Sequence, residues 1–166
     1  MCCRTSKSFT VLTKITSDIF EEAFSHCRWT TALSGVVEIV KANMEQGLYI
    51  NKTFDDIIMR VYSLCRDVKG LGMLSAYDIA SAICRFYSIN IDKVYIIGGG
   101  PRRAVKLLDL KTKKHIVSND IKINYVEVVD LLQALSSHNV ELERELITST
   151  NGDLFETFIC IWQKGV

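Results

Sequence analysis

The chain has 166 residues, of which 48% are hydrophobic and 23% are charged, and this ordinary globular composition excludes a disordered regulator. The length fits about one domain, which can bury a core without disulfides or metals. Because 20 lysines and arginines nearly balance 19 aspartates and glutamates, the net charge of +1 excludes binding to nucleic acid by overall charge alone.

Apolar residues recur at helical spacing along most of the chain. Thr53 is placed to cap the helix that begins at Phe54, and Asp55 and Asp56 suit its first turn. Residues 1–8 show no such periodicity, and we expect them to form a flexible tail. The predicted helices cover residues 18–28, 32–44, 54–68, 75–87, 102–110, 125–135, 141–148 and 153–163.

Residues 91–97 fit two types of element. Their valine, tyrosine and isoleucine side chains favour a strand, yet a short helix also fits. Three glycines at 98–100 end this segment, and Pro101 suits the first position of the helix that follows. Residues 111–124 are expected to be a polar connector. The sequence therefore predicts a mainly α fold: a single compact multi-helix domain over residues 1–166, with at most one short strand near 93–97.

The cysteines and histidines show no metal-binding pattern. None of the six cysteines forms a C-x-x-C pair, and none stands at zinc-ligand spacing from His26, His115 or His138, so no metal and no cofactor are predicted. No stretch approaches the ~18–20 apolar residues that a membrane span needs, and the N-terminus lacks the features of a secretory signal. We therefore expect a cytoplasmic protein with no membrane partner.

A glycine pattern occurs twice in the middle of the chain. Gly70-Leu71-Gly72 is followed by Ala76, and Gly98-Gly99-Gly100 is followed by Ala104 at the same spacing. This pattern resembles the helix-hairpin-helix motif, and its duplication resembles the tandem form of that motif. The resemblance implies a helix-hairpin-helix-like core over residues 54–110 that contacts nucleic-acid phosphates.

Glycine-rich hairpins of this kind expose backbone N–H groups at the start of the next helix, where phosphates bind. Basic side chains flank both hairpins. The candidate nucleic-acid-binding residues are Lys69, Gly70, Gly72, Gly98, Gly100, Arg102, Arg103 and Lys106. The alternative is that both glycine segments are tight helix–helix turns in which Ala76 and Ala104 allow close packing.

Two enzyme interpretations compete for the same residues. A strand followed by Gly98-Gly99-Gly100 resembles the start of a dinucleotide-binding fingerprint, but Arg103 stands where the third glycine is needed. The resemblance to helix-hairpin-helix DNA glycosylases implies a catalytic role for Asp92, although Lys93 and Val94 follow it where that family has a Thr-His pair. The sequence therefore favours a binding protein over an enzyme.

The charge is unevenly distributed along the chain. Residues 69–114 carry nine basic and three acidic side chains, whereas residues 115–166 carry three basic and eight acidic ones. This asymmetry indicates either an anionic partner or attraction between the two segments. We expect sequence-independent binding of nucleic-acid phosphates, with two alternatives: a helical protein–protein interaction protein without a nucleic-acid ligand, and a glycosylase-like enzyme using Asp92.

Tyr77-Asp78 and Val94-Tyr95 also resemble a core of uncharacterised bacterial proteins, which implies no activity.

Overall fold

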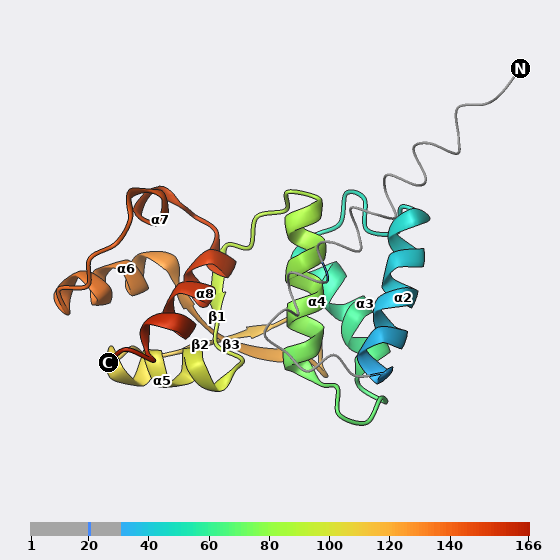
Figure 1. The fold of residues 1–166 in the computed structure, drawn as a ribbon, viewed down its shortest axis with the longest axis horizontal. Helices are drawn as coiled ribbons and strands as arrows, with labels where there is room; N and C mark the ends of the chain where they lie inside the picture. The colour runs from blue at the N-terminus through green and yellow to red at the C-terminus, as the bar shows by residue number, and fades with distance from the viewer. Residues whose placement is uncertain (1–19, 21–30) are drawn as a thin grey trace, which may run out of the picture. The chain divides into compact units, whose positions relative to one another are not determined.

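The structure is a computed structural model that describes residue 20 and residues 31–166 (Figure 1). The helix expected at 18–28, apart from Phe20, and the tail expected at 1–8 lie outside the described residues. The chain divides into two compact units, Met1–Ile89 and Asn90–Val166. The expectation of a single domain stays a prediction, because two compact units can be parts of one domain.

The first unit contains three described helices (Figure 1). They are α2 (Thr31–Glu45), α3 (Phe54–Cys65) and α4 (Met73–Phe86). All three were predicted, and α3 ends three residues earlier than expected. Thr53 caps α3 in a reciprocal capping box: its hydroxyl accepts from the Asp56 N–H at 3.2 Å, and its own N–H donates to the Asp56 carboxylate at 3.0 Å.

Helix α4 is the most deeply buried element of the first unit. Its buried side chains lie on nearly all sides of the helix rather than on one stripe: Ala76, Tyr77, Ile79, Ala80, Ser81, Ala82, Ile83 and Cys84. Such a pattern is typical of a helix inside a core. Phe54 of α3 meets Tyr77 edge-on, with ring centroids 6.1 Å apart, and this pair links the two helices across the hairpin.

The second unit combines a small sheet with four helices (Figure 1). The strands are β1 (Lys93–Tyr95), β2 (Lys113–Ile116) and β3 (Lys122–Glu127), and they form an antiparallel sheet in the order β1-β3-β2. The helices are α5 (Gly99–Leu107), α6 (Val128–Ser137), α7 (Arg144–Thr148) and α8 (Gly152–Trp162). The mainly helical class is confirmed for the described residues, but the sheet is larger than the single short strand expected.

Two predictions in the second unit were wrong. Residues 111–124 are not a polar connector, and the helix expected at 125–135 begins at Val128, since Tyr125 and Val126 belong to β3. The cause is strand pairing: β3 lies between β1 and β2, and Tyr125 stands opposite both Tyr95 and Lys113 in the sheet. The alternation of buried Ile121 and Ile123 with exposed Lys122 and Asn124 was a strand signal that a search for helical periodicity passes over.

The two faces of the sheet carry different chemistry. Val94 and Val126 are opposite each other and lie in a core cluster with apolar residues of the helices: Ala104, Val105, Leu108, Leu131, Leu135, Phe155 and Ile159. Because side chains alternate along a strand, Tyr95 and Tyr125 belong to the other face. On that face the Tyr95 hydroxyl and the His115 Nδ1 are hydrogen-bonded at 2.6 Å.

Helix α8 begins against the outer strand β1. The Gly152 N–H donates to the Ile91 carbonyl oxygen at 2.6 Å. A Cβ atom at Gly152 would overlap the Lys93 carbonyl and lie 2.9 Å from the Val94 nitrogen, so only glycine fits there. The start of α8 thereby covers part of an open sheet edge. Asn151 caps α8 by accepting from the Asp153 N–H at 3.1 Å.

A helix that crosses a membrane must be long and apolar. None of the helices within residues 31–166 meets both requirements.

Candidate nucleic-acid interface

The first glycine segment joins two helices, as the resemblance implied. Residues 66–72 connect α3 to α4, and Gly70 has a φ of 89°, which side-chain-bearing residues rarely adopt. Gly72 is the N-cap of α4 and makes no side-chain cap. The first N–H groups of α4 therefore receive no hydrogen bond from an N-cap side chain, and Lys69 is an exposed residue of the connecting segment.

The second glycine segment has a different structure. Strand β1, not a helix, precedes it, because the Ile96 N–H donates to the Asn124 carbonyl oxygen of β3 at 2.8 Å. Helix α5 begins at Gly99 with Gly98 as its N-cap, so Pro101 is the third helical residue rather than the first. This copy lacks the preceding helix that a tandem helix-hairpin-helix would have. The two glycine segments belong to different compact units.

Gly100 has a packing role. A Cβ atom there would lie 2.6 Å from the Cys160 Sγ and 3.4 Å from the Cys160 Cα of α8. Glycine at this position is therefore required by packing against α8, which is a different contact from the tight helix–helix turn considered as the alternative. Gly99 differs, since a Cβ atom there would meet nothing within 4 Å, and Gly99 is exposed.

The candidate arginines and lysine of α5 share the solvent side of that helix. Arg102, Arg103 and Lys106 are exposed, whereas the opposite side buries Ala104 and Val105. Within residues 31–166, none of the three cations makes a recorded ion pair. Arg103 also donates from Nη2 to a main-chain oxygen of Val166 at 3.5 Å. The structure thus places three of the predicted binding residues on one cationic helix face.

The hairpin of β2 and β3 adds two lysines that the sequence reasoning did not select. Lys114 faces Asn124 and Lys122 faces Ile116 in the register, so both lysines lie on the same face of the hairpin. Both are exposed. Among the described residues, neither lysine is recorded in an ion pair. An alternating strand pattern over residues 113–116 and 122–127 is the sequence signal that would have placed Lys114 and Lys122 on one face.

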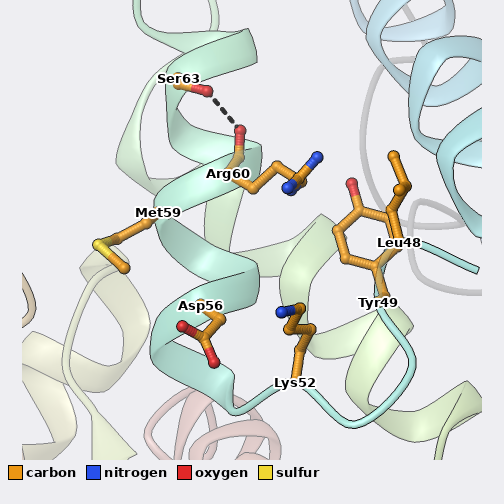
Figure 2. Close-up of a pocket in the computed structure, with 7 residues that line it drawn as sticks. All are labelled: Leu48, Tyr49, Lys52, Asp56, Met59, Arg60 and Ser63. Carbon is orange, nitrogen blue, oxygen red and sulfur yellow. Dashed lines mark hydrogen bonds between the residues drawn. The ribbon is translucent and has the colours of Figure 1, made fainter.

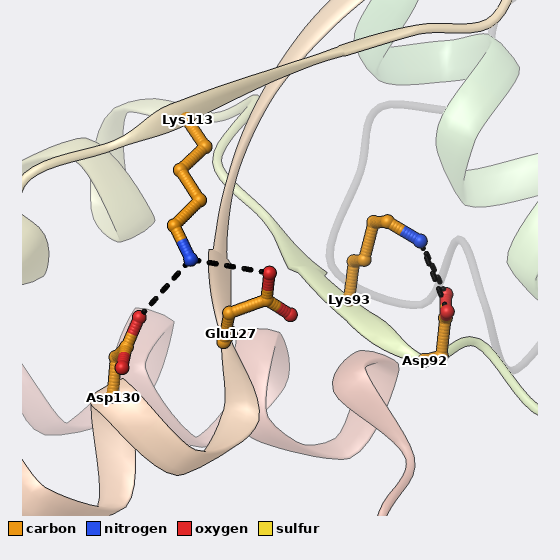
Figure 3. Close-up of polar contacts among 5 residues, drawn as sticks. All are labelled: Asp92, Lys93, Lys113, Glu127 and Asp130. Carbon is orange, nitrogen blue, oxygen red and sulfur yellow. Dashed lines mark hydrogen bonds and ion pairs between the residues drawn. The ribbon is translucent and has the colours of Figure 1, made fainter.

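Lys113 is on the opposite face of the hairpin and is already neutralised. Its Nζ donates to Glu127 Oε1 at 3.2 Å and to Asp130 Oδ2 at 3.5 Å (Figure 3). The hydrogen bond to Glu127, with the nearby Asp130 carboxylate, raises the pKa of the Lys113 ammonium. Because side chains alternate between the two faces of the hairpin, the ion-paired Lys113 lies on one face and Lys114 and Lys122 lie on the other.

Asp92 is a surface residue. Its side chain is 73% exposed and forms an ion pair with Lys93 Nζ at 2.9 Å (Figure 3). The described pockets are lined by other residues. A base-flipping enzyme needs its catalytic group inside a pocket, so this placement favours an ordinary surface role for Asp92.

The described residues, 20 and 31–166, contain no group of three or more His, Cys, Asp or Glu side chains that could hold a metal ion.

Comparisons of the chain with models of protein families, with curated proteins and with solved structures found no match.

Proposed function

We propose that this protein binds the phosphate backbone of nucleic acids without sequence preference, through the cationic face of α5. The observation that carries the proposal is the exposure of Arg102, Arg103 and Lys106 on one side of a helix, with no ion pair to an Asp or Glu side chain within residues 31–166. Contacts of this kind position a protein on nucleic acid but read no bases.

The charge of the surrounding segment supports this ligand. Residues 102–122 carry more basic than acidic side chains, with Asp109 and Asp120 as the acidic ones. Arg102 lies in the first turn of α5, where a positive charge opposes the helix dipole and costs a few tenths of a kcal/mol. A bound phosphate reverses that cost, because anions are favourable at a helix N-terminus.

Lys114 and Lys122 are candidate secondary contacts on the hairpin. Among the described residues they form no ion pair with a carboxylate, whereas Lys113 is paired, so each can neutralise a phosphate. Lys114 lies on the outer strand β2, where a lysine also prevents edge-to-edge aggregation, and that role needs no ligand. The α5 residues are therefore the sharper test, with the hairpin lysines and Lys69 as secondary contacts.

The test is binding of a labelled mixed-sequence duplex, a single strand and an RNA hairpin at ~50 and ~200 mM salt. We expect affinity to fall by roughly tenfold or more between these salts, since each phosphate contact releases counterions. Arg102→Glu/Lys106→Glu should abolish binding. These side chains point away from the buried face of α5, so the variant keeps its fold, which circular dichroism checks.

Arg144→Glu provides a matched control for Arg102→Glu. Both arginines are exposed, both lie in helices of the second unit, and each change alters the net charge equally. Retained binding in Arg144→Glu with loss in Arg102→Glu supports a localised site. Equal loss in both variants, or no binding at ~50 mM salt, contradicts the proposal.

Protein–protein interaction is the second candidate function, and the surface of α6, α7 and α8 favours it. Two hollows of about 540 and 390 Å³ share Glu141 as a lining residue. Ile147 and Leu154 at these hollows are 54% and 48% exposed. Glu143 and Glu145 line the second hollow, so the surface fits a basic amphipathic segment of a partner. A salt-resistant complex lost in Leu154→Ser, with nucleic-acid binding absent, would favour this function.

A further inference from the structure

A second basic feature lies in the first unit, on the exposed side of α3. Asp56, Met59, Arg60 and Ser63 stand at the spacing of one helix face and border a hollow of about 490 Å³. The other wall is the turn between α2 and α3, which supplies Leu48, Tyr49 and Lys52 (Figure 2). A hollow of this volume is in the range of small-molecule sites.

The path of the turn brings Lys52 to the start of α3. Gly47 has a φ of 72° and Asn51 a φ of 55°, and these two left-handed residues reverse the chain between the helices. Figure 2 shows the Lys52 and Arg60 side chains extending from the turn and from α3 toward the same side, where the Tyr49 ring lies. Neither cation makes a recorded ion pair within residues 31–166.

Asp56, the carboxylate among the residues that line this hollow, is already engaged. Its Oδ2 accepts from the Thr53 hydroxyl at 2.8 Å and from the Thr53 N–H at 3.0 Å. These hydrogen bonds lower the pKa of Asp56, with a smaller contribution from nearby Lys52. Asp56 keeps its negative charge and interacts with Lys52 through space, but within residues 31–166 neither Lys52 nor Arg60 forms an ion pair with an Asp or Glu side chain.

Tyr49 closes the hollow on its inner side. Its side chain is fully buried, and its hydroxyl accepts from Asn43 Nδ2 at 3.5 Å. Burial raises the pKa of Tyr49, so the phenol is neutral at physiological pH. The half-buried Leu48 therefore offers apolar contact beside the two cations, while the fully buried Tyr49 ring supports the wall of the hollow.

We propose that this hollow binds a small phosphomonoester, with Lys52 and Arg60 on the phosphate and Leu48 against an apolar or aromatic body. A phosphomonoester carries two negative charges and three free oxygens, so it can contact both cations at once, whereas a carboxylate carries one charge on two oxygens. The planar arginine fork also matches two phosphate oxygens at once. This site is separate from the α5 surface and takes a free small molecule rather than a polymer backbone.

The probe is phenyl phosphate, titrated into the full-length ¹⁵N-labelled chain and followed by amide chemical shifts. We expect saturable shifts concentrated at residues 48–63. Benzoate and benzyl alcohol, which carry one negative charge and none, should bind at least about tenfold more weakly. Inorganic phosphate alone should produce shifts at the same amides with lower affinity, because it lacks the ring.

Lys52→Ala and Arg60→Ala should each weaken phenyl phosphate by at least about tenfold. Both side chains are exposed and outside the capping box, so the fold is retained, as unchanged amide shifts in α4 will report. Arg66→Ala removes an exposed arginine just after the same helix, outside the hollow, and should leave binding unchanged. Arg60→Lys should bind with intermediate affinity.

Three results would overturn the proposal: no saturable shifts at residues 48–63, equal affinity for phenyl phosphate and benzoate, or equal effects of Arg60→Ala and Arg66→Ala. Each is independent of nucleic-acid binding by α5, which is measured on different variants.

Discussion

The two glycine segments share one sequence pattern and differ in structure. Gly70-Leu71-Gly72 connects helix α3 to helix α4, whereas Gly98-Gly99-Gly100 connects strand β1 to helix α5. Gly70 is required for its backbone conformation, because its φ is 89° while a Cβ atom there would meet nothing within 4 Å. Gly100 is required because Cys160 of α8 occupies the space of its missing side chain.

The difference shows that the spacing of glycines predicts where a helix or strand ends, but not why glycine is required there. In the first unit the cause is local, since the turn itself needs a left-handed residue. In the second unit the cause is an approach between segments that are distant in sequence. Substitutions at these positions should therefore separate local strain from overpacking.

Gly152→Ala should have the largest effect on stability. A methyl group there would overlap backbone atoms of Lys93, and backbone cannot move aside as a flexible side chain can. We expect a loss at or above the upper end of ~1–3 kcal/mol for overpacking, measured by urea unfolding. Hydrogen exchange should show the loss in amides of β1 and α8. Unchanged stability would mean that α8 does not begin against β1.

Gly100→Ala should cost about 1–3 kcal/mol, because its methyl group would meet Cys160 Sγ at 2.6 Å. Cys160→Ala in the same chain removes that sulfur and should restore part of the stability, which a double-mutant cycle measures as coupling. Gly99→Ala is the matched control in the same helix turn. It meets no atom within 4 Å and should be neutral or stabilising.

Gly70→Ala should cost about 1 kcal/mol through backbone strain alone, since a left-handed conformation disfavours a Cβ atom. Gly72→Ala serves as its partner control: its φ of −163° is open to any residue, and a Cβ atom there meets nothing within 4 Å. Thermal unfolding of the two variants compares them directly. Equal losses would argue against a strain-based role for Gly70.

Thr53→Ala should cost about 1 kcal/mol at neutral pH, because it removes the hydroxyl that accepts from the Asp56 N–H. Part of this cost should depend on pH. The Thr53 N–H and, to a smaller extent, its hydroxyl hold the pKa of Asp56 below its ordinary value of 3.8. The hydroxyl's share of this stabilisation is therefore present above that value and is lost as the pH falls through the folded-state pKa. Urea unfolding at pH 7 and at a pH below that folded-state pKa should show a smaller difference between parent and variant at the lower pH.

The first unit and the second unit were not equally predictable. Helices α2, α3 and α4 follow from apolar residues at helical spacing, and the cap at Thr53 follows from its position before Phe54. The basic face of α5 was also visible, because Arg102, Arg103 and Lys106 are close in sequence. These signals depend on residues close together in the sequence, so they predict a helix whatever the helix packs against.

Tertiary structure decided which segments form the sheet and which of its lysines are ion-paired. Strand β2 consists of lysine, histidine and isoleucine, and only its pairing with β3 makes it a strand. The same pairing separates Lys114, which has no recorded carboxylate partner among the described residues, from Lys113, which meets Glu127. No spacing along the chain reveals that partner.

The sequence by itself determined the helical segments, the cap of α3 and the cationic side of α5, since each depends on residues within a few positions of one another. Tertiary structure alone decided the pairing of β1 with β3 and the requirement for glycine at 100 and 152. Strand register and the space around a missing side chain are set by segments far apart in the chain, which local periodicity does not encode.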